Sequence, residues 1–179
     1  MSSNRIGKYA CLEIERRYLL AALPADLAQT SGWRITDRYF PATRLRLRRM
    51  QAIRGDEVIY KLTQKYRAEN QSAAETTITN FYLSAAEYNL LLPLDALTVE
   101  KTRHPYADAQ ARHFSIDVFA GRHAGLILAE IEGESASALP AFALADVTAD
   151  PFFRGGHLAG LTEVEFQQGL AQRLREHAG

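Results

Sequence analysis

The sequence predicts an α+β domain made mainly of antiparallel strands. Short runs in which apolar and polar residues alternate follow one another from residue 11 to residue 134, and this period of two is typical of half-buried strands. Few segments have a helical pattern, and two of them begin with a capping box. The strands are not separated by helices in a regular way, which argues against a parallel sheet.

Composition points to an ordinary folded protein. Of the 179 residues, 47% are hydrophobic and 23% are charged, so we expect one domain over residues 1–179. Lys plus Arg and Asp plus Glu both number 21, which argues against a basic surface for nucleic acid. Neither a signal-peptide pattern nor a membrane-spanning apolar run is found, so we expect a cytoplasmic protein without a membrane partner. A homodimer is compatible with the sequence. Cys11, beside an apolar strand position, is expected to be a buried, inert thiol.

The elements follow from local patterns. Strands are expected within 11–20, 33–40, 43–49, 57–66, 75–83, 97–106, 113–119 and 125–134. Helices are expected at 23–29, at 84–92 with Ser84 and Glu87 as a capping box, and at 163–177 with Thr162 and Glu165 as a second box. A loop is expected at 135–140 and a turn at 154–157.

The segment "CLEIERRYLL" places Glu13, Glu15 and Arg17 on one face of a strand and apolar residues on the other. The later strands repeat this pattern with one sign of charge on each strand. Eight basic residues share the charged face: Arg17, Arg44, Arg46, Arg48, Lys61, Lys65, Lys101 and Arg103. Six acidic residues share it as well: Glu13, Glu15, Glu75, Asp117, Glu130 and Glu132.

Segregation of sign by strand favours an inward charged face over a solvated one. A solvated face usually mixes Thr, Ser, Lys and Glu, because like charges in neighbouring positions repel one another. Three arginines spaced two apart are stable only if an anion lies among them, and paired carboxylates require a cation. A closed sheet with this face inside would bring both groups together around a metal and a polyanion.

These residues resemble the CYTH domains, or triphosphate tunnel metalloenzymes, whose first strand reads E-x-E-x-K and here reads Glu13-Ile14-Glu15-Arg16-Arg17. The likeness continues in order through "LRLRR", "KLTQK", "EKTRHPY", "SIDVFAG", "GLILAEIEGES" and "DVTADPFF". It implies an antiparallel closed barrel of about eight strands around a tunnel, with helices packed outside. It also implies hydrolysis of a triphosphate-containing small molecule with Mg²⁺ or Mn²⁺.

The resemblance assigns roles to the charged face. The catalytic residues would be Glu13, Glu15 and Arg17, and the substrate would be bound by Arg44, Arg46, Arg48, Lys61, Lys65, Lys101 and Arg103. The metal would be held by Glu13, Glu15, Glu130, Glu132, Asp117 and Glu75. The chemistry of the residues agrees, because clustered carboxylates select hard cations and arginine suits phosphate.

The chain departs from the family pattern in five places. Arg17 replaces a lysine, Ala73 and Thr77 stand where an R-x-E-x-E strand has its Arg and second Glu, Asp146 replaces the Glu of an E-V-T segment, and Ala145 replaces a basic residue. Two other functions therefore remain open beside the triphosphatase. One is a class IV-type adenylyl cyclase, and the other is a non-catalytic sensor of polyphosphate or nucleotide.

Overall fold

The computed structural model describes residues 8–69, 71–133 and 138–177. In this part of the chain nine strands form one sheet. They are β1 (Cys11–Leu19), β2 (Trp33–Tyr39), β3 (Leu45–Ala52), β4 (Val58–Tyr66), β5 (Glu75–Leu83), β6 (Leu97–Ala107), β7 (His113–Phe119), β8 (Ile127–Glu132) and β9 (Ala145–Asp146). The expected antiparallel strands are thereby confirmed.

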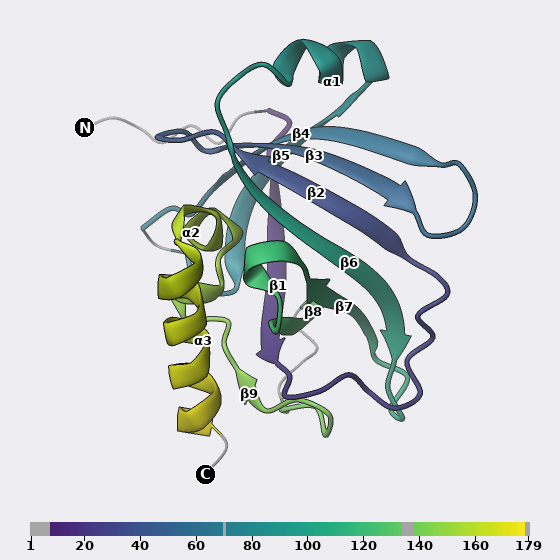
Figure 1. Ribbon diagram of the computed structural model, residues 1–179, viewed down its shortest axis with the longest axis vertical. Helices are drawn as coiled ribbons and strands as arrows, with labels where there is room; N and C mark the ends of the chain where they lie inside the picture. Colours follow the sequence, from purple (N-terminus) through teal and green to yellow (C-terminus); the bar gives the residue numbers. More distant parts are fainter. Residues whose placement is uncertain (1–7, 70, 134–137, 178–179) are drawn as a thin grey trace.

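The sheet closes on itself through β1, which pairs with a different neighbour along each half (Figure 1). Its first residues, Cys11 to Ile14, pair antiparallel with β5, and Glu15 to Leu19 pair antiparallel with β8. The remaining strands follow in the order β5-β4-β3-β2-β6-β7-β8. The result is a closed antiparallel barrel of eight strands, with the short β9 added beside the end of β1.

The inward face of the barrel changes from charged to apolar along its length. On β1 the inward positions run from Glu13 to Leu19, and on β6 they run from Arg103 to Val99. The apolar end is filled by Phe153 and other side chains that belong to one buried core. Apolar side chains of this core, among them Phe153 and Leu158, also line the polar cavity inside the barrel.

The helices lie outside the barrel (Figure 1). They are α1 (Ala85–Leu91), α2 (Gly155–Gly160) and α3 (Glu163–His177), with short 3₁₀ turns η1 (Gly121–His123) and η2 (Pro151–Phe153). Both predicted capping boxes form: Ser84 accepts from the N–H of Glu87, and Thr162 accepts from the N–H of Glu165. Helix α3 packs its buried Phe166 and Leu170 into the core at the apolar end.

Several local predictions were wrong. Residues 23–29 form turns rather than a helix, with Leu27 buried against the outer face of the barrel. Residues 155–160 form α2 rather than part of a turn, because Leu158 and Ala159 gain a buried surface there. Cys11 is exposed rather than buried, since it lies at the first position of β1. The predicted loop at 135–140 lies partly outside the described residues. Within the described part, no helix has the length and apolar character needed to cross a membrane.

Candidate active site

The barrel encloses a polar cavity of about 230 Å³. Seven basic side chains line it: Arg17, Arg46, Arg48, Lys61, Lys65, Lys101 and Arg103. Five acidic side chains line it: Glu13, Glu15, Asp37, Glu130 and Glu132. Most of the charged residues predicted from alternation therefore meet in one enclosed space, as the closed sheet requires.

The carboxylates are concentrated on the neighbouring strands β1 and β8. Antiparallel pairing sets Glu15 opposite Glu132 and Arg17 opposite Glu130, and directly opposed residues on one face have side chains within reach of each other. Burial and the nearby charge of Glu130 raise the pKa of Glu15 above its ordinary value. Two like charges are thus held close together in a buried place, which a bound cation would stabilise.

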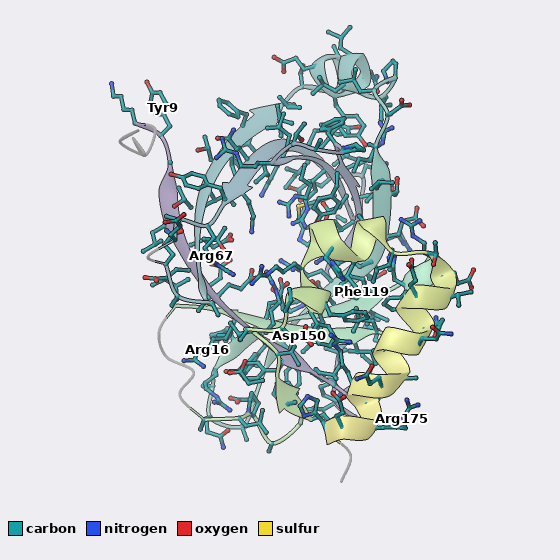
Figure 2. All side chains as sticks on the ribbon, turned by 90° about the vertical axis from the view of Figure 1, so that its left-hand side faces the viewer. Tyr9, Arg16, Arg67, Phe119, Asp150 and Arg175 are labelled. Carbon is teal, nitrogen blue, oxygen red and sulfur yellow. The ribbon has the colours of Figure 1, made fainter. Side chains whose placement is uncertain are left out.

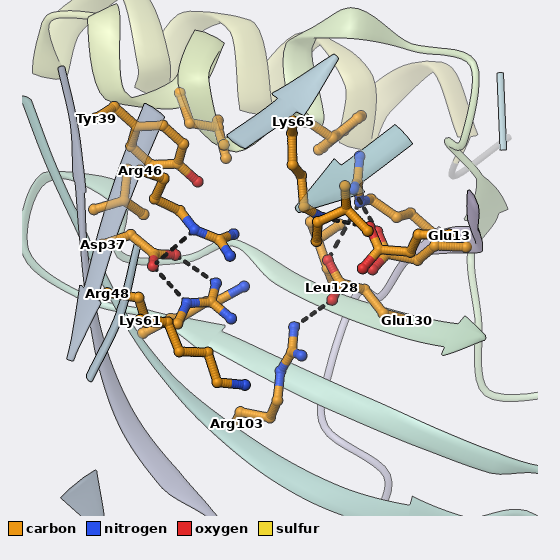
Figure 3. A pocket seen from close by; sticks show the side chains of 18 of the residues that line it. Glu13, Asp37, Tyr39, Arg46, Arg48, Lys61, Lys65, Arg103, Leu128 and Glu130 are labelled. Atoms are coloured by element: carbon orange, nitrogen blue, oxygen red, sulfur yellow. Dashed lines mark hydrogen bonds and ion pairs between the residues drawn. The ribbon is translucent and has the colours of Figure 1, made fainter. Parts of the chain in front are cut away.

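Most of the basic side chains come from the opposite side of the barrel. Figure 3 shows Arg46, Arg48 and Lys61 on one side of the cavity and Glu13 and Glu130 on the other. Strand register explains the placement, because Arg48 lies directly opposite Lys61 on the neighbouring strand. The side chains of β3 and β4 therefore form a basic wall that faces the acidic wall of β1 and β8.

Three bases pair with the acidic wall: Arg17, which lies on β1 itself, and Lys65 and Arg103, which reach it from β4 and β6. Arg17 donates from Nη2 to Glu15 and from Nε to Glu130, the latter at 3.2 Å. Lys65 pairs with Glu13, and Arg103 pairs with Glu130 (Figure 3). Burial alone would lower the pKa of Arg17, but Glu15 and Glu130 outweigh it and raise the pKa further above its ordinary value. Arg17 is a permanent positive charge in the centre of the site.

Asp117 lies behind the cavity wall rather than in it. Its carboxylate is fully buried, accepts two hydrogen bonds of 2.7 Å from Arg103, and pairs with Lys101. Burial lowers the pKa of Lys101, although Asp117 acts in the opposite direction. With both oxygens engaged, Asp117 acts as the residue that orients Arg103 and Lys101 rather than as a metal ligand.

Sequence reasoning missed Asp37 and Tyr39 of β2, both of which line the cavity. Asp37 is 1% exposed and accepts bonds of 2.6 Å from Nε and Nη2 of Arg48. Burial would raise the pKa of Asp37, but the guanidinium of Arg48 and then that of Arg46 hold it well below its ordinary range. The sequence did contain a signal: Asp37 is an acidic residue on the strand face that otherwise carries the apolar Ile35 and Tyr39.

Comparison with known proteins gives a consistent picture. No protein-family model matches the sequence, and no curated protein matches it either. Two solved structures of NE1496 do match the chain. One, described as an inorganic triphosphatase, is 26% identical with a TM-score of 0.56, and the match covers 84% of this chain and 95% of that one. The other, described as a hypothetical protein, is 26% identical with a TM-score of 0.55, and the match covers 82% of this chain and 97% of that one. A putative adenylyl cyclase from Hippeastrum, described as having a dominant triphosphatase activity, is 12% identical with a TM-score of 0.43, covers 93% and 88%, and is too distant to carry an argument. Three observations agree on the same fold: the closed eight-stranded barrel, the charged motifs that face its interior, and the match to nearly the whole of NE1496. The closed eight-stranded barrel is the fold that the resemblance to CYTH domains implies.

Within this barrel, strand β5 turns inward the face opposite to the one predicted from alternation. Glu13 lies opposite Thr76, and Ile14 lies opposite Glu75, so Thr76 faces inward and Glu75 faces outward. The carboxylate of Glu75 accepts from the N–H of Ser72 at 2.7 Å, and this hydrogen bond lowers the pKa of Glu75. The prediction of Glu75 as a metal ligand was wrong, because one residue of register moves a strand's side chains to the other face.

The same register places the departures at Ala73 and Thr77 outside the site. Thr77 lies opposite the outward Leu12, and Ala73 lies in the turn before β5. Asp146 of β9 is also outside, where it pairs with Arg16 at 3.0 Å, while Ala145 is buried in the core. Of these five departures, Arg17 is the one that changes the inner surface of the described barrel.

Arg44 precedes β3 and does not line the inner cavity. It is exposed at the barrel opening, with its guanidinium carbon 5.0 Å from the centre of the Tyr66 ring. The expectation that Arg44 continues the arginine row of β3 was wrong for the inner cavity. It lines a second cavity at the opening instead.

The acidic wall fits a hard divalent cation by the chemistry of its donors. Glu13, Glu15, Glu130 and Glu132 offer only carboxylate oxygens, the ligands that Mg²⁺ and Mn²⁺ prefer. Burial, and after it the charge of Glu130, raises the pKa of Glu15, so a cation beside these carboxylates would stabilise their charged form. In the described part of the chain, no three acidic, His or Cys side chains are already grouped as a metal site. Binding of a cation would therefore require Arg17 or Lys65 to release its carboxylate partner.

Proposed function

We propose that the chain hydrolyses the terminal anhydride bond of a linear triphosphate in its inner cavity, with Mg²⁺ or Mn²⁺ as cofactor. The observation that carries this proposal is the pair of facing walls, acidic on β1 and β8 and basic on β3 and β4, within one cavity of about 230 Å³. The likeness to NE1496, described as an inorganic triphosphatase, supports it.

The basic wall suits several phosphates in a row. Arg46, Arg48 and Lys61 come from two adjacent strands, and Arg103 approaches from a third. Guanidinium groups bind phosphate oxygens through paired hydrogen bonds, and ammonium groups bind them as point charges. A linear chain of phosphates would meet a different base at each step, whereas a single phosphate would engage only part of the wall.

The acidic wall would hold the cation through Glu13, Glu15, Glu130 and Glu132. A divalent ion bound there supplies a Lewis acid that offsets phosphate charge and lowers the pKa of a water molecule. In the reaction a water oxygen bonds to the terminal phosphorus while the bond from that phosphorus to the bridging oxygen breaks. The products are orthophosphate and pyrophosphate, and the proton from water passes to solvent.

Arg17 would act as a fixed charge and not as a base. Its guanidinium cannot lose a proton under these conditions, and Glu15 and Glu130 raise its pKa further. The guanidinium of Arg17 lies between Glu15 and Glu130. Once a cation binds these carboxylates, the guanidinium would be free to contact a phosphate. It would then stabilise the charge that develops on the phosphate oxygens in the transition state.

The test is a measurement of phosphate release with Mg²⁺ and with Mn²⁺. The substrates are tripolyphosphate, thiamine triphosphate, ATP and pyrophosphate. We expect release from at least one triphosphate and much less from pyrophosphate, and no release after chelation of the metal. Tight binding of all three triphosphates without release from any of them would contradict hydrolysis.

A second candidate function is a sensor that binds a triphosphate without turnover. The observation that favours it is the pairing of Glu13, Glu15 and Glu130 with Lys65, Arg17 and Arg103. If these pairs persist when the ligand binds, three of the four acidic-wall carboxylates stay engaged, and Glu132 alone offers a cation too few ligands. Binding that is independent of Mg²⁺, together with absent phosphate release, would support the sensor over the enzyme.

A further inference from the structure

A second cavity of about 560 Å³ adjoins the inner one at an opening beside the start of α2. We call it the mouth cavity. The two cavities share wall residues, among them Arg17, Tyr39 and Lys65, so they lie directly beside each other. The remaining wall of the mouth cavity comes from residues 40–45, from the end of β4 and from the start of α2. Figure 2 shows Arg67 at this opening.

The charge of the mouth cavity differs from that of the inner cavity. Its charged lining residues are all basic: Arg17, Arg44, Arg46, Lys65, Arg67 and Arg154. The inner cavity, in contrast, has carboxylates beside its bases. An acid-free group of cations around an open space has a strongly positive potential, which attracts anions.

Arg67 is held in place without losing its charge. Its Nε donates to the carbonyl oxygen of Glu75 at 2.9 Å, and its Nη2 donates to that of Ala73 at 2.5 Å. Carbonyl oxygens fix the guanidinium but carry no net charge. Burial lowers the pKa of Arg67, and the charges of Arg154 and Arg17 lower it further. The guanidinium is thus oriented in advance and repelled by its neighbours.

Arg44 and Arg154 have no acidic partner either. Arg44 lies over the ring of Tyr66, and within the described residues neither arginine forms an ion pair with a carboxylate. The carboxylate of Glu75, which is close in sequence to Arg67, is turned toward Ser72 instead. Within the described residues, Arg44, Arg67 and Arg154 therefore have no carboxylate partner, and an external anion could offset their charge.

From this charge distribution we infer that the mouth cavity binds the phosphates beyond the third in a linear polyphosphate. The substrate class would be inorganic polyphosphate longer than tripolyphosphate, with its end in the inner cavity and its chain leaving through the mouth. This inference rests on the proposed function of the inner cavity. A neutral organic group would leave the arginines unpaired, whereas each further phosphate offers oxygens that a guanidinium binds in pairs.

The test compares the binding of tripolyphosphate and linear tetrapolyphosphate by calorimetry in Mg²⁺ and low salt, where surface charge is least screened. The variants are Arg154→Gln and the double variant Arg67→Gln/Arg154→Gln. Arg154 is exposed and its side chain makes no capping bond, so its substitution leaves folding intact. Arg175→Gln is the matched control, because Arg175 lies on α3 far from the opening (Figure 2).

We expect wild type and Arg175→Gln to bind tetrapolyphosphate more tightly than tripolyphosphate. That gain should shrink on the order of threefold to fivefold for each mouth arginine removed. Equal affinity for both ligands, or a gain that survives the double substitution, would overturn the inference. The inference would also be overturned if ATP showed the same increase in affinity over tripolyphosphate, because the mouth cavity would then bind an organic group equally well. Failure to bind or hydrolyse tripolyphosphate would instead overturn the proposed function of the inner cavity.

Discussion

The carboxylate of Asp37 accepts two parallel hydrogen bonds from Arg48, from Nε to Oδ1 and from Nη2 to Oδ2, both 2.6 Å long. Arg46 lies beside the same carboxylate, with its Nε 3.5 Å from Oδ1. One buried acid on β2 thus orients two arginines of β3 toward the inner cavity. It also offsets part of their mutual repulsion when no phosphate is present.

Asp37→Asn should destabilise the protein by about 3 kcal/mol, because it leaves the buried charge of Arg48 without a partner. The free energy of unfolding from urea titration measures the loss. Asp56→Asn, at an exposed position, is the matched control and should be neutral. A loss below about 1 kcal/mol would mean that solvent or another group already offsets the charge of Arg48.

The stability supplied by Asp37 should also depend on pH. Because the folded protein holds the pKa of Asp37 well below its ordinary value of 3.8, the unfolded chain binds the proton more readily. The contribution is therefore fully present above about pH 4 and is lost as pH falls toward the folded pKa. We expect the difference between wild type and Asp37→Asn to be constant from neutral pH to about pH 5 and to narrow below about pH 4. A difference that widens in acid would contradict this assignment.

Glu130→Gln should weaken the binding of Mg²⁺ and Mn²⁺, since it removes one of the carboxylates of the acidic wall while keeping its size. Titration of the cation against phosphate release, or calorimetry with Mn²⁺, measures the change, for which we expect at least a tenfold loss, or about 1.4 kcal/mol. Glu100→Gln, on the exposed outer side of β6, is the control. An unchanged cation titration in Glu130→Gln would remove that residue from the metal site.

Arg17→Lys tests whether the positive charge at this position acts only through its sign. If it does, turnover should change little, and Arg17→Ala should weaken triphosphate binding because it removes a charge from the cavity wall. Arg16→Ala is the matched control on the neighbouring residue, which faces outward and pairs with Asp146. A rise of tenfold in turnover for Arg17→Lys, worth about 1.4 kcal/mol of barrier, would show that a smaller ammonium group is required.

Affinity should rise from orthophosphate to pyrophosphate to tripolyphosphate, because each further phosphate reaches another base of the wall formed by Arg46, Arg48 and Lys61. Calorimetric titration of the three anions in the same buffer measures the series. Equal affinity along the series would mean that these side chains do not form one continuous binding surface.

Gly155→Ala should disturb the joint between the barrel and α2. A Cβ at Gly155 would lie 2.0 Å from Oη and 2.8 Å from Cζ of Tyr39, so the ring or the helix must move, at about 1–3 kcal/mol. Gly156→Ala is the matched control, since its Cβ would meet Tyr39 only at 3.7 Å and alanine favours a helix. Adding Tyr39→Phe should restore part of the lost unfolding temperature in Gly155→Ala. No rescue would place the strain elsewhere.

Local patterns in the chain predicted most of the elements. Helix α3 runs from Glu163 to His177 as expected, because its capping box and its apolar spacing lie close together in sequence. The prediction failed where tertiary contacts decide the local structure, as at Gly155–Gly160. The glycines of this segment disfavour a helix, but burial of Leu158 in the core stabilises the helical conformation. It failed again at residues 23–29, which pack on the barrel as turns.

The sequence by itself determined which side of each strand is charged, and that the acids and bases of that side, apart from Arg17, lie on different strands. Alternation is a local property of an extended chain, so Glu13 and Glu15, or Arg46 and Arg48, share a face in any fold that makes those residues a strand. Only the tertiary structure decided which charges meet. Strand register turned Glu75 outward and placed Asp37 beside Arg48, because pairing depends on partners far away in the chain and one residue of shift reverses a side chain's direction.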